Sequence, residues 1–283
     1  MKTFAFIFSL LVSCLAVAED PLNPNRQWWD PAWWSEGALA IPANHPVRTR
    51  YTSYFNGDVG IPVLIARPDD NKKYPAVLFV HGRRGLDDLV ILHLKRLAAR
   101  GFVALAPDVY SGRFIEKMPI EHDYALEADV NLGVDFLLSQ PDISSSRICL
   151  YSHTRGGYIS LKVAVTHGRQ AREVACYVSY YPHMQDPNAP EPMQVYRYAT
   201  EADDLLIPAL IFIGDREQYQ RRRSIETAVK SMQEDGRPVE LFVYPGVGRG
   251  FDFRSERVRT LADDLAAKDA IQRAARFMRR HLE

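Results

Sequence analysis

The chain has few cysteines, only three among its 283 residues. The spacing of its cysteines and histidines is not that of a structural zinc site, so we expect no metal and no cofactor. Cys149 and Cys176 lie in apolar, strand-like runs, where cysteine commonly serves as a small buried hydrophobe. Two cysteines on neighbouring parallel strands rarely have suitable disulfide geometry. We therefore predict that both are free thiols.

The chain also lacks an excess of either charge, because 35 Lys and Arg residues balance 35 Asp and Glu residues. Non-specific phosphate binding needs a basic excess, so nucleic acid is not an expected partner. Internal repeats and low-complexity tracts are absent, and beyond the first residues no apolar run is long enough to span a membrane. With 47% hydrophobic residues the chain can bury one large core, which predicts a single domain.

Residues 1–18 have the features of a secretory signal peptide. Lys2 supplies the positive start, residues 4–15 are apolar, and Ala16-Val17-Ala18 forms a small-residue cleavage site. We expect the mature chain to begin near Glu19 and to be periplasmic or secreted. Residues 11–14 also resemble a bacterial lipoprotein box, and in that alternative Cys14 carries a lipid anchor.

Residues 19–46 form a lead segment rich in proline and tryptophan. It contains all four tryptophans of the protein, namely Trp28, Trp29, Trp33 and Trp34. These rings could form an exposed platform for a protein partner, a sugar or a membrane interface. The other interpretation, which we favour, is that the rings pack onto the domain.

Residues 47–283 show the pattern of one α/β domain. Residues 47–55 and 61–67 alternate like strands around an Asn-Gly pair at 56–57, which predicts a β-hairpin. From residue 74, continuous apolar runs alternate with amphipathic segments, as in buried parallel strands and crossover helices. The predicted strands are 76–80, 103–106, 148–151, 174–181, 209–213 and 239–244. The predicted helices are 88–100, 123–139, 156–167, 224–234 and 261–281.

Four stretches resemble the dienelactone hydrolase family. They are residues 75–82 (PAVLFVHG), 100–110 (RGFVALAPDVY), 140–148 (QPDISSSRI) and 244–251 (YPGVGRGF). The resemblance extends over residues 47–282 and implies an α/β-hydrolase fold, with a mostly parallel central sheet, an N-terminal β-hairpin and helices on both faces. Activity is a separate matter, because function resides in sites and not in folds.

The resemblance also assigns three catalytic positions. The family places its nucleophile in a Gly-x-Nuc-x-Gly-Gly elbow, and residues 152–157 (SHTRGG) put Thr154 at that position. The acid position falls on Glu217, with Asp215 nearby, and the histidine position falls on Arg249. Arginine stays protonated and accepts no hydrogen bond, so it cannot act as a general base near neutral pH. We therefore expect no ordinary triad hydrolysis, and a salt bridge between Arg249 and Glu217.

A hydroxyl is a weak nucleophile unless a base takes its proton. His183 follows a predicted strand and His122 lies in a predicted rim segment, so either histidine could replace the lost base. We interpret His81 as a turn residue, and we expect the side chain of His153 to point away from that of Thr154.

Several arginines fall on the loops at the carboxyl ends of the strands, where α/β folds bind ligands. They are Arg83, Arg84, Arg155, Arg216 and Arg249, and His183 lies on the same side. Because guanidinium groups bind carboxylate and phosphate in a bidentate manner, they could line an anion pocket. Alternatively they are surface charges paired with nearby acidic residues. We interpret the run Arg221–Arg223 as a solvated face.

These observations favour an exported pseudo-hydrolase that binds a small anion or a protein partner at the former active-site face. The enzymatic alternative is a divergent esterase or lactonase that uses Thr154 with a non-standard base. A third possibility is an accessory protein that docks through its Trp-rich lead.

Overall fold

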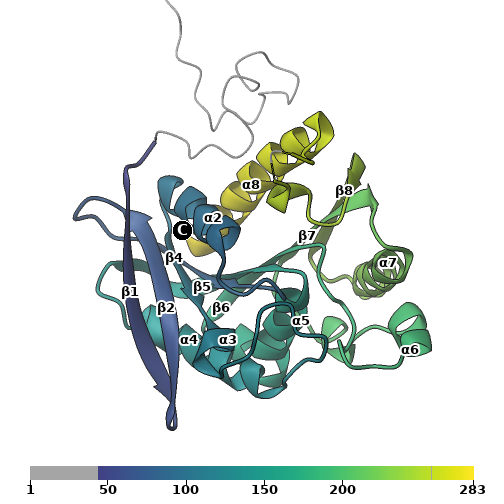
Figure 1. Ribbon diagram of the computed structural model, residues 1–283, viewed down its shortest axis with the longest axis horizontal. Helices are drawn as coiled ribbons and strands as arrows, with labels where there is room; N and C mark the ends of the chain where they lie inside the picture. The colour runs from purple at the N-terminus through teal and green to yellow at the C-terminus, as the bar shows by residue number, and fades with distance from the viewer. Residues whose placement is uncertain (1–43, 256) are drawn as a thin grey trace, which may run out of the picture.

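The computed structural model describes residues 44–255 and 257–283, and its centre is an eight-stranded sheet (Figure 1). The strand order is β1-β2-β4-β3-β5-β6-β7-β8, with antiparallel pairing of β1 to β2 and of β2 to β4, and parallel pairing elsewhere. The strands are β1 (Val47–Asn56), β2 (Val59–Pro68), β3 (Tyr74–Val80), β4 (Val103–Pro107), β5 (Ile143–His153), β6 (Val174–Tyr180), β7 (Ala209–Arg216) and β8 (Val239–Gly248).

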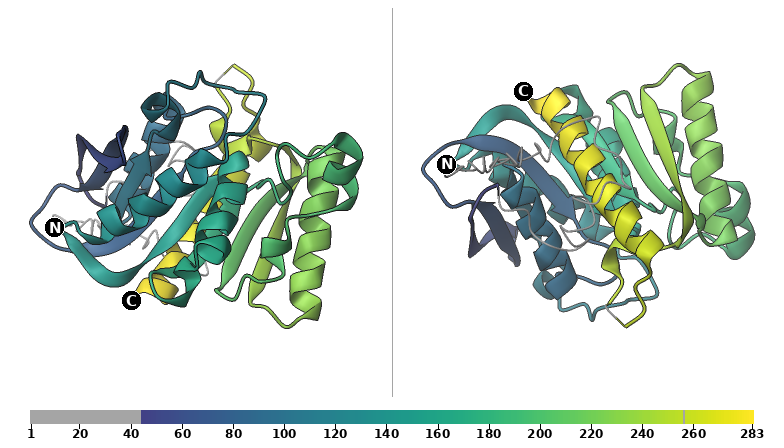
Figure 2. Two further views of the ribbon diagram at one scale, coloured as in Figure 1. Left: turned by 90° about the horizontal axis from the view of Figure 1, so that it is seen from below. Right: turned by 90° about the horizontal axis from the view of Figure 1, so that it is seen from above.

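Helices cover both faces of this sheet (Figure 2). On one face lie α2 (Asp88–Ala99) and α8 (Leu261–Leu282), and on the other lie α4 (Ala125–Leu138) and α5 (Arg155–Leu161). The remaining helices are α3 (Val109–Gly112), α6 (Glu191–Tyr196) and α7 (Tyr219–Glu234), with short helical turns at Lys162–Thr166, Arg169–Ala171, Thr200–Ala202 and Phe251–Phe253. The predicted α/β-hydrolase architecture, including the N-terminal hairpin, is confirmed.

Local sequence signals explain where several elements begin. Gly57 adopts a left-handed φ of 57° in the β1–β2 turn, which glycine tolerates without steric cost. Helix α8 begins after a capping box, in which Thr260 and Asp263 satisfy each other's backbone N–H groups. Helix α7 begins at Tyr219, five residues earlier than predicted, and the side chain of its N-cap residue, Gln218, makes no capping hydrogen bond.

The prediction of two free thiols is wrong. Cys149 on β5 and Cys176 on β6 form a disulfide, with their Cα atoms 4.7 Å apart. The two residues are direct partners in the parallel register, so their side chains leave the sheet on the same side. This register depends on how the two strands pair, and the apolar pattern of each strand carries no information about it.

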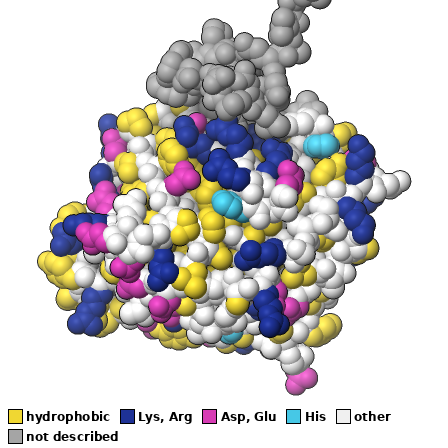
Figure 3. All heavy atoms as spheres, turned by 180° about the vertical axis from the view of Figure 1, so that it is seen from behind, with side chains coloured by type: hydrophobic (Ala, Val, Ile, Leu, Met, Phe, Trp, Pro, Cys, Tyr) yellow, Lys and Arg dark blue, Asp and Glu magenta, His cyan; other side chains and the backbone are white. Residues whose placement is uncertain are grey.

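The surface carries no large field of one sign on the face shown in Figure 3, where basic, acidic and apolar side chains are interspersed. Among the described residues, no helix is long and apolar enough to cross a membrane. The signal peptide, Cys14 and the four tryptophans fall outside the described part of the chain. The expectations about them stay predictions.

Candidate functional site

Thr154 occupies a sharp turn between β5 and α5. Its backbone has φ 51° and ψ −119°, a conformation that a β-branched residue adopts only at a steric cost. Glycines make the turn possible: a Cβ at Gly156 would lie 2.2 Å from the Val80 carbonyl oxygen, and one at Gly157 would lie 2.4 Å from Pro182 Cβ. The strand–turn–helix elbow predicted for residues 152–157 is therefore present, with Thr154 at its apex.

The Thr154 hydroxyl is buried and has no hydrogen-bond partner. A Cβ at Gly82 would come within 1.8 Å of Thr154 Oγ1, so the β3 end leaves just enough room for this hydroxyl. His183 contacts the elbow through its backbone, since its N–H donates to the Thr154 carbonyl at 2.8 Å. No histidine nitrogen in the described chain accepts the Thr154 proton in this geometry, so the nucleophile position lacks an engaged base.

Arg249 and Glu217, the residues that the family resemblance assigns to the histidine and acid positions, pair with each other. Arg249 Nη1 donates to Glu217 Oε1 at 3.2 Å, and the Glu217 side chain is fully buried. The guanidinium also lies over the Tyr181 ring, 5.3 Å from its centroid. A carboxylate that orients a histidine in a triad is here bound to a permanent cation.

Four arginines act together on this region. Burial lowers the pKa of His183 well below its usual value, and the charges of Arg249, Arg221, Arg155 and Arg83 lower it further, in that order. Burial and the neighbouring guanidinium groups also lower the pKa of Arg221 to about 10, with Glu217 as the opposing carboxylate. The site thus brings together four guanidinium groups and one carboxylate.

Several polar atoms of this cluster have no protein partner. They are Arg221 Nη1, Arg249 Nη2, Glu217 Oε2, Gln185 Nε2 and His183 Nδ1. Buried polar groups in proteins are normally hydrogen-bonded, because an unpaired one costs about 1–3 kcal/mol. Two guanidinium nitrogens without partners, beside unneutralised positive charge, are suited to the oxygens of an anion.

The structure sorts the arginines predicted for this face into two groups. Arg83 and Arg155 join the cluster, and they also hold the segment 118–121, donating to the backbone carbonyls of Met118, Pro119, Ile120 and Glu121. Arg84 is exposed and pairs with Asp87, with Nε donating to Oδ2 at 2.7 Å, and Arg216 is exposed at the end of β7.

The interpretation of Arg221 as part of a solvated face is wrong, because it is partly buried and belongs to the cluster. The early start of α7 explains the error. With the helix beginning at Tyr219, Arg221 lies in its first turn, where Glu217 acts on its charge.

The other histidines are engaged elsewhere. His81 Nδ1 lies 2.9 Å from the Gly82 carbonyl oxygen, and His122 Nε2 lies 3.3 Å from Glu127 Oε1. His153 Nε2 lies 2.7 Å from Asp252 Oδ2, so its ring takes part in a different set of contacts from the Thr154 hydroxyl. His153 and Asp252 lie close to His93, and the three side chains form a buried group of potential metal ligands. No spacing in the sequence indicates this group.

An apolar groove of about 290 Å³ lies between β8 and α8, lined by Phe242, Val243, Tyr244, Leu265 and Ala266. Its lining includes neither Thr154 nor any of the four clustered arginines. This groove therefore contains none of the candidate catalytic or anion-binding residues. The elbow around Thr154 is the better candidate for the functional site.

Comparison with known proteins identifies the family of this chain. Residues 61–282 match the model of the dienelactone hydrolase family. The chain is 24% identical over 237 residues to a probable 2-oxo-3-(5-oxofuran-2-ylidene)propanoate lactonase from Bradyrhizobium sp, covering 80% of this chain and 92% of that protein. It is 23% identical over 216 residues to a putative carboxymethylenebutenolidase from Aquifex aeolicus, covering 74% of this chain and 89% of that one.

Solved structures show the same fold. A putative dienelactone hydrolase from Klebsiella pneumoniae superposes with a TM-score of 0.65 at 22% identity, covering 83% of this chain and 99% of that one. A dienelactone hydrolase-like promiscuous phosphotriesterase from metagenomic libraries has a TM-score of 0.63 at 16% identity, covering 82% and 98%.

Proposed function

The chain belongs to the dienelactone hydrolase family, and we propose that its altered active-site face binds a small carboxylate or phosphate anion without ordinary triad hydrolysis. The observation that carries this proposal is the Arg249–Glu217 pair together with the buried, unpartnered nitrogens Arg221 Nη1 and Arg249 Nη2. The charges of Arg155 and Arg83 act on the same region. Arg249 at the histidine position cannot accept a proton, but it can hold an oxyanion.

The charge balance supports an anionic ligand over a neutral one. Charges in a partly buried site interact several times more strongly than in water, so four guanidinium groups against one carboxylate leave a substantial positive potential. A ligand with two or more oxygens would supply acceptors for Arg221 Nη1 and Arg249 Nη2, which have none in the protein. A neutral ester would not neutralise the positive potential of the arginines.

We also propose that the protein acts outside the cytoplasm, in the periplasm or as a secreted protein. Two features support this: the signal-like sequence of residues 1–18, and the disulfide between Cys149 and Cys176. Disulfides persist in oxidising compartments and are rare in the cytosol.

Titration calorimetry with inorganic phosphate and with succinate, at constant ionic strength, tests the binding proposal. We expect saturable binding that weakens about tenfold or more in Arg249→Gln and in Arg221→Gln, because charge-assisted hydrogen bonds contribute about 1.5–3 kcal/mol each. Arg216→Gln is the matched control, since Arg216 is exposed and we expect its loss to leave affinity unchanged. Equal affinity of Arg249→Gln and the unaltered protein would refute the site.

A second candidate function is ester or lactone hydrolysis with Thr154 as nucleophile. The strained backbone of Thr154 favours it, because such strain is usually retained where a mechanism uses it. His183 is the candidate base, because its backbone N–H binds the Thr154 carbonyl and burial lowers its pKa well below the usual value, which leaves it unprotonated at neutral pH. Activated esters and dienelactone-type substrates should then be turned over by the unaltered protein and by neither Thr154→Ala nor His183→Ala. Turnover that Thr154→Ala retains in full rules this candidate out.

A further inference from the structure

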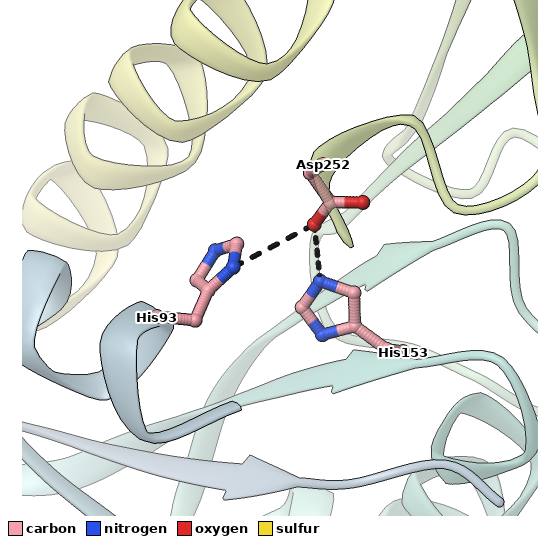
Figure 4. Close-up of side chains that lie close together, drawn as sticks. All are labelled: His93, His153 and Asp252. Atoms are coloured by element: carbon pink, nitrogen blue, oxygen red, sulfur yellow. Dashed lines mark hydrogen bonds and ion pairs between the residues drawn. The ribbon is translucent and has the colours of Figure 1, made fainter. Parts of the chain in front are cut away.

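A second polar cluster lies on the α2 side of the elbow and contains none of the four arginines. It consists of His93 on α2, His153 at the end of β5, and Asp252 in the turn at Phe251–Phe253 (Figure 4). All three side chains are buried, with relative exposures of 1%, 1% and 3%. They come from three distant parts of the chain, and both imidazole rings turn one nitrogen toward the same carboxylate oxygen.

The distances differ from those of a simple hydrogen-bonded triad. His153 Nε2 lies 2.7 Å from Asp252 Oδ2, but His93 Nδ1 lies 3.6 Å from the same oxygen, beyond hydrogen-bonding range. His93 Nδ1 is therefore a buried nitrogen with no hydrogen-bond partner, aimed at a carboxylate. An unpaired buried nitrogen is costly for a protein to retain, so this geometry calls for an explanation.

Two tyrosines contact the outer atoms of His93 and Asp252, whereas the outer nitrogen of His153, Nδ1, has no hydrogen-bond partner. His93 Nε2 lies 2.6 Å from the Tyr151 hydroxyl, and the Tyr181 hydroxyl donates to Asp252 Oδ1. Metal-binding histidines commonly bond through their other ring nitrogen to an oxygen, and metal-binding carboxylates are themselves hydrogen-bonded. The inner atoms, His93 Nδ1, His153 Nε2 and Asp252 Oδ2, remain directed at one another.

We propose that these three inner atoms bind one divalent transition-metal ion, of which Zn²⁺ is the first candidate. Two imidazole nitrogens and one carboxylate oxygen form a common zinc ligand set, with a fourth position open to water. Tetrahedral zinc with bonds of about 2.1 Å places its ligand atoms about 3.4 Å apart. His93 Nδ1 and Asp252 Oδ2 are 3.6 Å apart, His153 Nε2 and Asp252 Oδ2 are 2.7 Å apart, and all three atoms lie within 4.8 Å of one another. Metal binding therefore requires His153 and Asp252 to move apart as the ion replaces the hydrogen bond between them.

The surroundings of the cluster moderate its affinity. Arg96, on the same helix as His93, interacts electrostatically with Asp252, and its positive charge opposes a dication. The site should therefore bind zinc more weakly than one built from thiolates. Bound metal would join α2 to the turn that holds Asp252, three residues after Arg249, and so fix the position of the anion-binding loop.

Metal content and spectroscopy of the purified, untagged chain test the proposal directly. After incubation with Zn²⁺ and removal of free ion, mass spectrometry of metals should find close to one zinc per chain, because residues 44–255 and 257–283 contain one such ligand set. Substitution with Co²⁺ should give the visible absorption of a four- or five-coordinate N/O site, without a thiolate charge-transfer band, since Cys149 and Cys176 are disulfide-bonded. Absence of bound metal in both experiments overturns the proposal.

Variants locate the ion. His93→Gln and Asp252→Asn should abolish the cobalt spectrum, whereas Tyr151→Phe keeps all three ligands and should weaken zinc binding by about 10–100-fold, as loss of an outer partner does. His81→Gln is the matched control, because His81 is equally buried but outside the cluster. Circular dichroism checks that each variant folds. A full cobalt spectrum in folded His93→Gln contradicts the assignment of the ligands. If His93→Gln fails to fold, unchanged zinc affinity in Tyr151→Phe contradicts the assignment instead.

This test is independent of the anion-binding proposal. Arg249→Gln should retain the zinc site, and His81→Gln should retain both sites, so failure of one proposal leaves the other open to its own measurement.

Discussion

At the scale of single residues, Thr154 and Arg249 carry the proposed function. Thr154 has the positive φ of a sharp elbow, and Arg249, which we assign to the position of the family's base, is paired with Glu217. Backbone geometry is set by the glycines and strands around the elbow, whereas proton transfer depends on one side chain. Under the proposed function, a single substitution at the base position removes the ordinary chemistry and leaves the architecture intact.

The strain at Thr154 predicts an unusual response to glycine. At φ 51° and ψ −119°, any side chain with a Cβ costs of order 1–3 kcal/mol, and glycine relieves that cost. Glycine also gives the unfolded chain about 0.5–1 kcal/mol of additional entropy, which offsets part of the gain. We expect Thr154→Gly to be more stable than Thr154→Ala by about 1 kcal/mol in urea unfolding. A glycine variant less stable than the alanine variant would show that the turn is unstrained.

His183 predicts a pH dependence of stability. Burial and the four arginines hold its pKa well below the unfolded value of about 6.5, so the unfolded chain binds a proton that the folded chain does not. The unfolding free energy should be highest above about pH 6.5 and fall as the pH decreases toward the folded pKa. His183→Asn should flatten this slope between about pH 6.5 and 5. His93, whose pKa is also lowered, is present in both proteins and cancels in the comparison.

At the scale of elements, the sheet and its coverings determine which residues meet. Strands β5 and β7 and the loop after β8 bring Thr154, Glu217 and Arg249 to one edge, as the carboxyl ends of neighbouring parallel strands do. Helix α5 then carries Arg155 and the first turn of α7 carries Arg221. The proposed anion site therefore depends on residues at the starts of these two helices as well as on residues that follow the strands.

The disulfide between β5 and β6 predicts a loss of stability when it is removed. Its half-cystines are 27 residues apart, and the chain-entropy estimate for a closed loop of this length is about 3.5 kcal/mol. Cys149→Ala combined with Cys176→Ala should lower the unfolding free energy by up to that amount under non-reducing conditions. Reductant should destabilise the unaltered protein and leave the double variant unchanged. Two titratable thiols at these positions in denatured, unreduced protein would contradict the bond.

At the scale of the whole molecule, the sequence predicts the fold better than the site. Apolar runs define the strands of the parallel sheet, and glycines at 156 and 157 locate the elbow, because both patterns are local. The disulfide depends on strand register, the role of Arg221 on where α7 begins, and the His93–His153–Asp252 cluster on three segments that meet only in the folded chain. These three features depend on contacts between distant segments, which no local sequence pattern specifies.

Binding and stability should oppose each other in this molecule. Arg221 has an unpaired, buried nitrogen, and burial and neighbouring guanidinium groups lower its pKa to about 10, so its charged form destabilises the ligand-free protein. We expect Arg221→Gln to raise the unfolding free energy without added anion by about 1 kcal/mol, as is common when a binding group is removed. Phosphate at about 100 times its dissociation constant should stabilise the unaltered protein by about 2.7 kcal/mol and the variant by clearly less. Urea unfolding with and without phosphate measures both effects. If Arg221→Gln is destabilised and gains as much from phosphate as the unaltered protein, then Arg221 is a structural residue and the positive cluster is not the ligand site.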